Sequence, residues 1–109
     1  MNVLYLITAL LLYGCASPQA DLMEGHRQEF ENYVRCNVIS AKSIANKEGD
    51  PVSMAFAARA MCGQEDVALH EAIARNHSLD MTLRLMGSTR ARTIERNAAV
   101  IVTVRGRRQ

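Results

Sequence analysis

Hydrophobic residues recur at spacings of three and four between residues 21 and 75, which is the pattern of one face of an α-helix. The first part of this region predicts a helix over residues 21–47. Its apolar stripe and the positions beside it consist of Phe30, Val34, Val38, Ala41 and Ala45, with Tyr33, Cys36, Ser40 and Ile44 alongside.

A turn signal interrupts the helical spacing at residues 48–51. Gly49 favours the end of one helix, while Asp50 and Pro51 suit the cap and the first position of the next. We expect a second helix up to about residue 75, followed by a break near residues 76–80. Gly63 lowers helix stability by about 1 kcal/mol relative to Ala, so it marks a kink. The buried face of this helix is expected to be Ala55, Ala58, Cys62, Leu69 and Ile73.

The C-terminal part of the chain fits two patterns. Residues 79–85 alternate between apolar and other residues, and residues 100–104 are mostly β-branched, as in strands. Residues 89–104 also hold helical spacing without Gly or Pro, and two isolated strands are only marginally stable. We favour a third helix, capped by Ser88 or Thr89, and keep a β-hairpin turning at Gly87 as the alternative. With helical spacing, one face of this segment would carry Met81, Leu85, Ile94, Ala98 and Ile101.

An uncharged apolar run occupies residues 3–14. As a helix it would measure about 18 Å, which is short of a bilayer core of about 30 Å and typical of the apolar part of a signal peptide. The run ends in LLYGC, residues 11–15. Leu12, Gly14 and Cys15 in this stretch resemble the signal of bacterial lipoproteins.

That resemblance implies cleavage between Gly14 and Cys15, diacylglyceryl transfer to the Cys15 sulfur and acylation of the new amine. Several acyl chains on one residue hold a soluble domain to a bilayer, where one chain binds only marginally. Residues 1–14 are then a signal peptide, 15–20 the lipidated cysteine and a tether, and 21–109 a small helical domain. Because Ala16 rather than Asp follows the cysteine, the resemblance favours the outer membrane, with the domain facing the periplasm. The alternative is ordinary cleavage after Ala16, which gives a soluble periplasmic or secreted protein.

Two cysteines remain if Cys15 carries lipid, and an oxidising periplasm would allow Cys36 and Cys62 to form a disulfide. Gly49 lies midway between the two cysteines, so an antiparallel hairpin of the first two helices would place them opposite each other, at the same distance from the turn. Closing that loop should contribute roughly 3 to 4 kcal/mol in the chain-entropy model. The expected fold is therefore all-α: a disulfide-linked antiparallel helical hairpin plus a third C-terminal helix.

Charge is distributed unevenly along the 109 residues, although the net charge is only +2. Beyond residue 83 the chain has seven arginines and a single acid, Glu95, whereas the preceding part of the domain is acidic. Guanidinium groups bind phosphates and carboxylates bidentately. We therefore expect a basic surface for an anionic partner, made of Arg84, Arg90, Arg92, Arg96, Arg105, Arg107 and Arg108.

Motifs for catalysis, metals and cofactors do not stand out in the sequence. The chain has no nucleophile elbow and no Gly-rich phosphate loop, and His70 and His77 lack the spacing of a zinc protease. We interpret His26, His70 and His77 as solvent-exposed, and expect no catalytic residue, metal or cofactor. Nucleic acid is not expected as a partner, because no aromatic residue lies among the arginines to stack on bases.

The layout resembles small exported helical proteins of Gram-negative bacteria that lack an assigned activity. We therefore expect a non-catalytic binding or structural module of the cell envelope, anchored by lipid and contacting an envelope protein or an anionic envelope surface. The alternative is a soluble secreted or periplasmic protein without an anchor, acting as an enzyme or a nucleic-acid binder.

Overall fold

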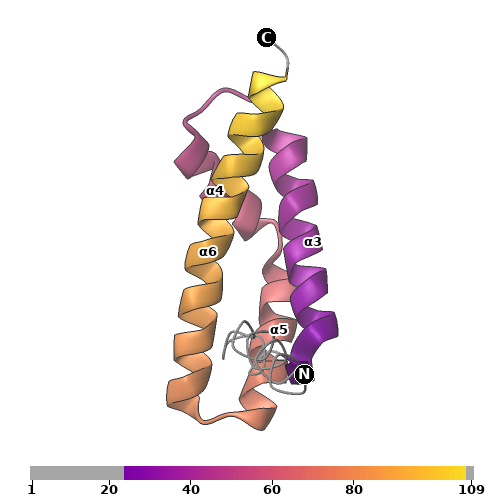
Figure 1. Ribbon diagram of the computed structural model, residues 1–109, viewed down its shortest axis with the longest axis vertical. Helices are drawn as coiled ribbons and strands as arrows, with labels where there is room; N and C mark the ends of the chain where they lie inside the picture. Colours follow the sequence, from indigo (N-terminus) through magenta and orange to yellow (C-terminus); the bar gives the residue numbers. More distant parts are fainter. Residues whose placement is uncertain (1–23, 108–109) are drawn as a thin grey trace, which may run out of the picture.

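The computed structural model describes residues 24–107, and over that range the fold is helical with no strand (Figure 1). The chain runs along α3, returns along α4 and α5, and runs forward again along α6, so the expected helical hairpin with a third helix is confirmed. The second leg of this bundle is divided into two helices. The elements are η1 (Glu24–His26), α3 (Arg27–Ile44), α4 (Pro51–Ala60), α5 (Gly63–Asn76) and α6 (Leu79–Gly106).

The turn between α3 and α4 follows its local sequence signals. Gly49 has a positive φ of 144°, a conformation that side chains with a Cβ rarely adopt. The Asp50 carboxylate accepts a hydrogen bond of 2.9 Å from the Ser53 amide, and Pro51 takes the first helical position. The predicted start of the second helix is thus confirmed.

The second leg breaks beside the disulfide. α4 ends at Ala60, α5 begins at Gly63, and the Met61 amide closes the end of α4 by donating to the Ala57 and Ala58 carbonyls. Cys62 lies in this break and is bonded to Cys36 of α3, with a Cα–Cα distance of 5.9 Å. The predicted disulfide and the kink expected near Gly63 are both confirmed.

The last helix is longer than expected, and the strand alternative is wrong. α6 begins at Leu79 rather than near Thr89, because Ser78 caps it: the Ser78 hydroxyl accepts a hydrogen bond of 3.2 Å from the Met81 amide. Gly87 lies inside the helix with open space around it. At the other end of the chain, α3 begins at Arg27 after a 3-10 turn rather than at residue 21.

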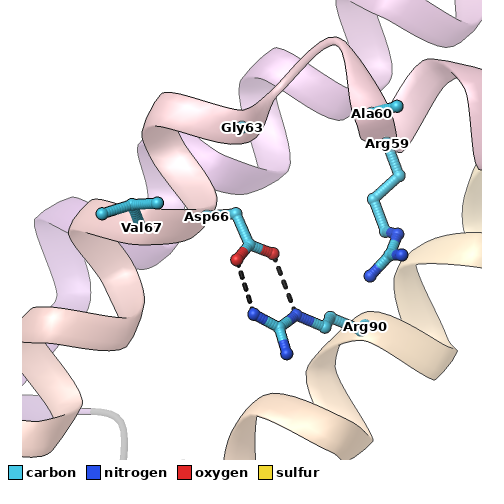
Figure 2. A pocket seen from close by; sticks show the side chains of 6 residues that line it. All are labelled: Arg59, Ala60, Gly63, Asp66, Val67 and Arg90. Carbon is cyan, nitrogen blue, oxygen red and sulfur yellow. Dashed lines mark hydrogen bonds and ion pairs between the residues drawn. The ribbon is translucent and has the colours of Figure 1, made fainter.

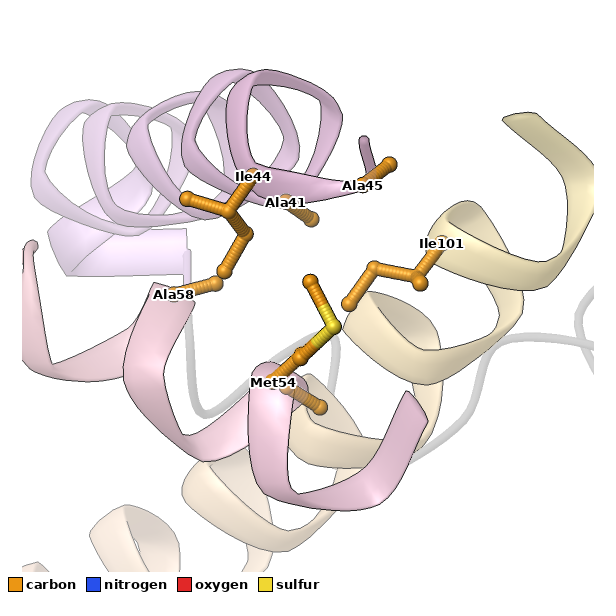
Figure 3. Packing of buried hydrophobic residues seen from close by; sticks show 7 residues of the cluster. Ala41, Ile44, Ala45, Met54, Ala58 and Ile101 are labelled. Atoms are coloured by element: carbon orange, nitrogen blue, oxygen red, sulfur yellow. The ribbon is translucent and has the colours of Figure 1, made fainter. Parts of the chain in front are cut away.

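Two apolar clusters hold the bundle together. At the end near the α3–α4 turn, Met54 of α4 points into the space between Ala45, which follows α3, and Ile101 of α6 (Figure 3). At the other end, Tyr33 of α3 packs with residues of α5 and α6. α6 contributes to both clusters because it spans the full length of α4 plus α5. The first cluster contains Ala41, Ile44, Ala45, Met54, Ala55, Ala58 and Ile101; the second contains Tyr33, Leu69, Ile73, Leu85 and Met86.

Buried polar residues lie between the two apolar clusters, at the level of the break between α4 and α5. We call the polar layer the buried residues Asn37, Ser40, Thr89, Thr93 and Asn97. Asn97 donates to Asn37 Oδ1 at 3.0 Å and to the Ala55 carbonyl at 3.2 Å, and Asn37 donates to the Tyr33 carbonyl. The Ser40 hydroxyl lies 3.5 Å from the Cys62 sulfur. Apolar spacing alone did not predict these positions, since it placed Val34 and Val38 on the buried stripe where Asn37 lies.

Candidate functional site

Arg90, one of the arginines expected to bind an anionic partner, is engaged within the chain. Its Nε and Nη2 donate to Asp66 Oδ2 and Oδ1 at 3.0 and 2.6 Å, a bidentate pair that joins α6 to the first turn of α5 (Figure 2). The Arg90 hydrogen bond lowers the pKa of Asp66, against the opposing effect of burial, and the same bond raises the pKa of Arg90. This arginine therefore has a structural partner already.

Arg105 also has partners within the chain. Its Nε donates to the Ala45 carbonyl at 3.0 Å and its Nη2 to the Lys47 carbonyl at 2.8 Å. These carbonyls follow the last turn of α3, where helix carbonyls lack intrahelical donors. Arg105 thus acts as a C-terminal cap for α3, supplied by the far end of the chain.

The remaining α6 arginines differ in whether their side chains form ion pairs. Arg84 forms an ion pair of 3.1 Å with Asp80, but both side chains are about three-quarters exposed, so the pair contributes little to stability. The side chains of Arg92, Arg96 and Arg107 make no hydrogen bond or ion pair with any residue of the 24–107 range. Arg108 and Cys15 lie outside the described residues.

Arg92 and Arg96 lie on the side of α6 that faces α3. Arg96 lines a hollow of about 500 Å³ together with Arg35, Phe30, Val34 and one acid, Glu31, of α3. Arg92 precedes Arg96 by one helical turn, so the two side chains share a face. We call Arg35, Arg92 and Arg96 the basic flank. Arg35 could not be predicted from the sequence, because its proximity to Arg96 arises from helix packing across 61 positions and leaves no local signal.

A second hollow of about 350 Å³ lies between the α4–α5 break and α6 (Figure 2). Arg59 of α4 extends toward the Asp66–Arg90 pair, and its positive charge also contributes to lowering the pKa of Asp66. Its guanidinium lies 6.0 Å from the centre of the Phe56 ring, within reach of a cation–π contact. Arg59 and Phe56 could not be predicted from the sequence, because they become neighbours of α6 only when the helices pack into the bundle.

The disulfide also defines a group of ligand-type atoms. Atoms of Cys36, Cys62 and Glu65 lie within 4.8 Å of one another. The two sulfurs are bonded to each other, and a metal requires them as thiolates. In the oxidised chain this group is therefore a structural crosslink between α3 and the break.

The interpretation of the histidines requires a correction. His26 is 1% exposed rather than solvent-exposed, and its ring meets that of His77 edge-on with the centroids 5.4 Å apart. His70 and His77 are half-buried. Burial lowers the pKa of His26, and the nearby His77 lowers it further. Neither ring nitrogen of His26 has a hydrogen-bond partner among residues 24–107. The 3-10 turn places His26 against the start of the α5–α6 connection, which no sequence pattern indicated.

No helix within residues 24–107 is both long enough and apolar enough to cross a bilayer. Comparisons of the chain with protein-family models, with curated proteins and with solved structures give no match.

Proposed function

We propose that this protein is a lipid-anchored, non-catalytic binding module of the cell envelope, held at the outer membrane through Cys15 and facing the periplasm. The LLYGC sequence supports the anchor, and the disulfide between Cys36 and Cys62 is in keeping with an oxidising compartment. The basic flank carries the binding proposal, because Arg92 and Arg96 are charged, exposed and without partners among the described residues.

The position of the basic flank favours a partner beside the bundle. Eight residues separate Cys15 from Glu24, and Glu24 lies at the end of the bundle where α6 begins (Figure 1). Arg92 follows Leu79 by thirteen positions, or about 20 Å of helix. Arg107 lies at the opposite end of α6, about 42 Å from that start. In an upright bundle the free arginines would therefore face an acidic envelope protein rather than the headgroups beneath the anchor.

The anchor is tested by labelling cells with radioactive palmitate. The wild-type chain should incorporate label, and Cys15→Ala should not. An intact mass that begins at Cys15 with added acyl mass supports the anchor. An unmodified chain beginning at Ser17, or labelling that persists in Cys15→Ala, would overturn it in favour of the soluble alternative.

The binding surface is tested by capture from an envelope extract. A variant carrying Arg92→Glu and Arg96→Glu should lose the captured partner, whereas Arg84→Glu should keep it, because Arg84 is already neutralised by Asp80. Parallel sedimentation with phosphatidylglycerol vesicles distinguishes headgroups from protein. Equal capture by the wild type and the double variant would contradict the assignment of the basic flank.

A further inference from the structure

An exposed groove runs between the α4–α5 leg and α6, away from α3. The hollow at the break and a second one of about 360 Å³ share Arg59 and Arg90 in their walls, so the two adjoin and together form a groove. We call it the α4–α6 groove. Phe56 and Ile94 line the part beside α4, and Val67 lines the part beside α5.

Apolar side chains continue this groove along both walls. Val52 lies one helical turn before Phe56 on α4, and Val102 lies two turns beyond Ile94 on α6. Val52, Phe56, Val67 and Val102 are each more than half exposed. Contiguous exposed apolar surface of this kind marks an interaction site in soluble proteins.

The charges of the groove are opposite on its two walls. Arg59 comes from α4 and Glu95 from α6, and both line the hollow beside Phe56. Neither forms an ion pair with another residue of the described chain. The third charged side chain of the wall, Arg90, is already neutralised by Asp66. A surface with one free cation on one wall and one free anion on the other is complementary to itself.

We propose that two copies of this chain pack groove to groove as a parallel, two-fold symmetric dimer. An axis parallel to the helices sets α4 of each copy against α6 of the other, so that Arg59 faces Glu95 of the partner subunit twice. An axis across the helices would instead set α4 against α4 and α6 against α6, so that Arg59 would not face Glu95 of the partner subunit. Charge complementarity therefore selects the parallel arrangement.

The parallel dimer is compatible with the other surfaces of the molecule. Both copies then present the end that carries Glu24 in the same direction, as two chains anchored in one membrane require. The basic flank lies on the α3 side of α6 and stays free. The dimer itself does not depend on the anchor, so a failure of palmitate labelling would leave this proposal standing.

Native mass spectrometry of the full chain, released from non-ionic detergent, tests the dimer. The wild type should show twice the protomer mass at concentrations of about 10 to 100 µM. Arg59→Glu or Glu95→Arg alone turns both attractive pairs into repulsive ones and should weaken dimerisation about tenfold or more. The Arg59→Glu/Glu95→Arg double variant restores both pairs in reversed order, and it should return to within about threefold of the wild type.

Matched reversals on α3, Arg27→Glu and Glu31→Arg, should leave the dimer intact, because α3 does not line the groove. Far-UV circular dichroism of each variant confirms folding. A wild type that stays monomeric at about 100 µM would overturn the proposal. So would a double variant as weak as either single variant, which would indicate an antiparallel dimer or an occupant of another kind.

Discussion

Asn97 of α6 donates a hydrogen bond of 3.0 Å to Asn37 Oδ1 of α3 in the buried layer between the two apolar clusters. The bond joins residues sixty positions apart, and Asn97 reaches α4 as well through the Ala55 carbonyl. One amide therefore touches all three legs of the bundle. A displacement of α6 by one turn would set Thr93 or Ile101 opposite Asn37, and neither side chain has the amide that bonds both Asn37 and Ala55, so the pair favours one register of α6.

Asn97→Leu should lower the free energy of unfolding by about 1 to 3 kcal/mol, because Asn37 Oδ1 is left buried without a donor. The Asn37→Leu/Asn97→Leu double variant should recover most of that loss, since Asn37 Oδ1, the buried acceptor left without its donor, is then removed as well. Urea denaturation of the oxidised chain measures both values. Losses that simply add in the double variant would contradict a direct coupling between the two amides.

The Cys36–Cys62 disulfide should stabilise the chain by about 3 to 4 kcal/mol, because it closes a loop with a sequence separation of 26 and restricts the unfolded state. Thermal unfolding with and without reductant measures this contribution. The Cys36→Ala/Cys62→Ala variant should unfold at a lower temperature and be insensitive to reductant. A wild type equally stable in both conditions would show that the bond constrains little.

Arg105→Ala should destabilise the protein by about 1 to 2 kcal/mol, because the carbonyls of Ala45 and Lys47 lose a charged donor. Arg107→Ala serves as the matched control and should change stability by less than about 0.5 kcal/mol, since this residue is exposed. Urea denaturation of both variants provides the comparison. Equal effects of the two substitutions would argue against the capping role of Arg105.

Because His26 is buried, we expect the protein to lose stability on mild acidification. Its pKa is below the ordinary value of 6.5 in the folded chain, chiefly because of burial and then of His77; Arg75 also lowers it and Glu29 opposes the change. The unfolded state therefore binds more protons, so the free energy of unfolding is constant above about pH 6.5 and falls as the pH drops toward the folded pKa. Denaturation between about pH 8 and pH 5 measures this change.

His26→Phe should remove the acid-dependent fall, because the ring of similar shape cannot titrate. His70→Gln should retain it, since His26 is still present. A pH profile of His26→Phe that matches the wild type would assign the effect to another group.

Local signals account for the parts of the fold that the sequence predicted. Gly49, Asp50 and Pro51 act on their own backbone, so the turn and the start of α4 could be read directly. The position of the disulfide followed from that turn. The start of α6 was missed because the alternation of residues 79–85 outweighed the Ser78 cap; in the helix, Leu79 and Leu83 are exposed while Leu85 is buried.

Contacts between distant residues account for most of what was missed. The partners of Arg90 and Arg105 lie 24 and 58 to 60 positions away, so composition could count these arginines but could not assign their roles. The buried Asn37 and Asn97 were invisible to an apolar pattern because each is satisfied only by another helix. The same holds for Arg59 and Glu95, which line one hollow only because α4 packs beside α6.

The cap that Arg105 places on α3 also bears on the order in which the chain can fold. Synthesis releases α3 well before Arg105, with some sixty residues between the carbonyl and its donor. Ile101, the one buried α6 residue of the first apolar cluster, also emerges long after α3. A nascent chain can thus form the turn between α3 and α4 early, but the end of α3 is completed only after α6 has emerged.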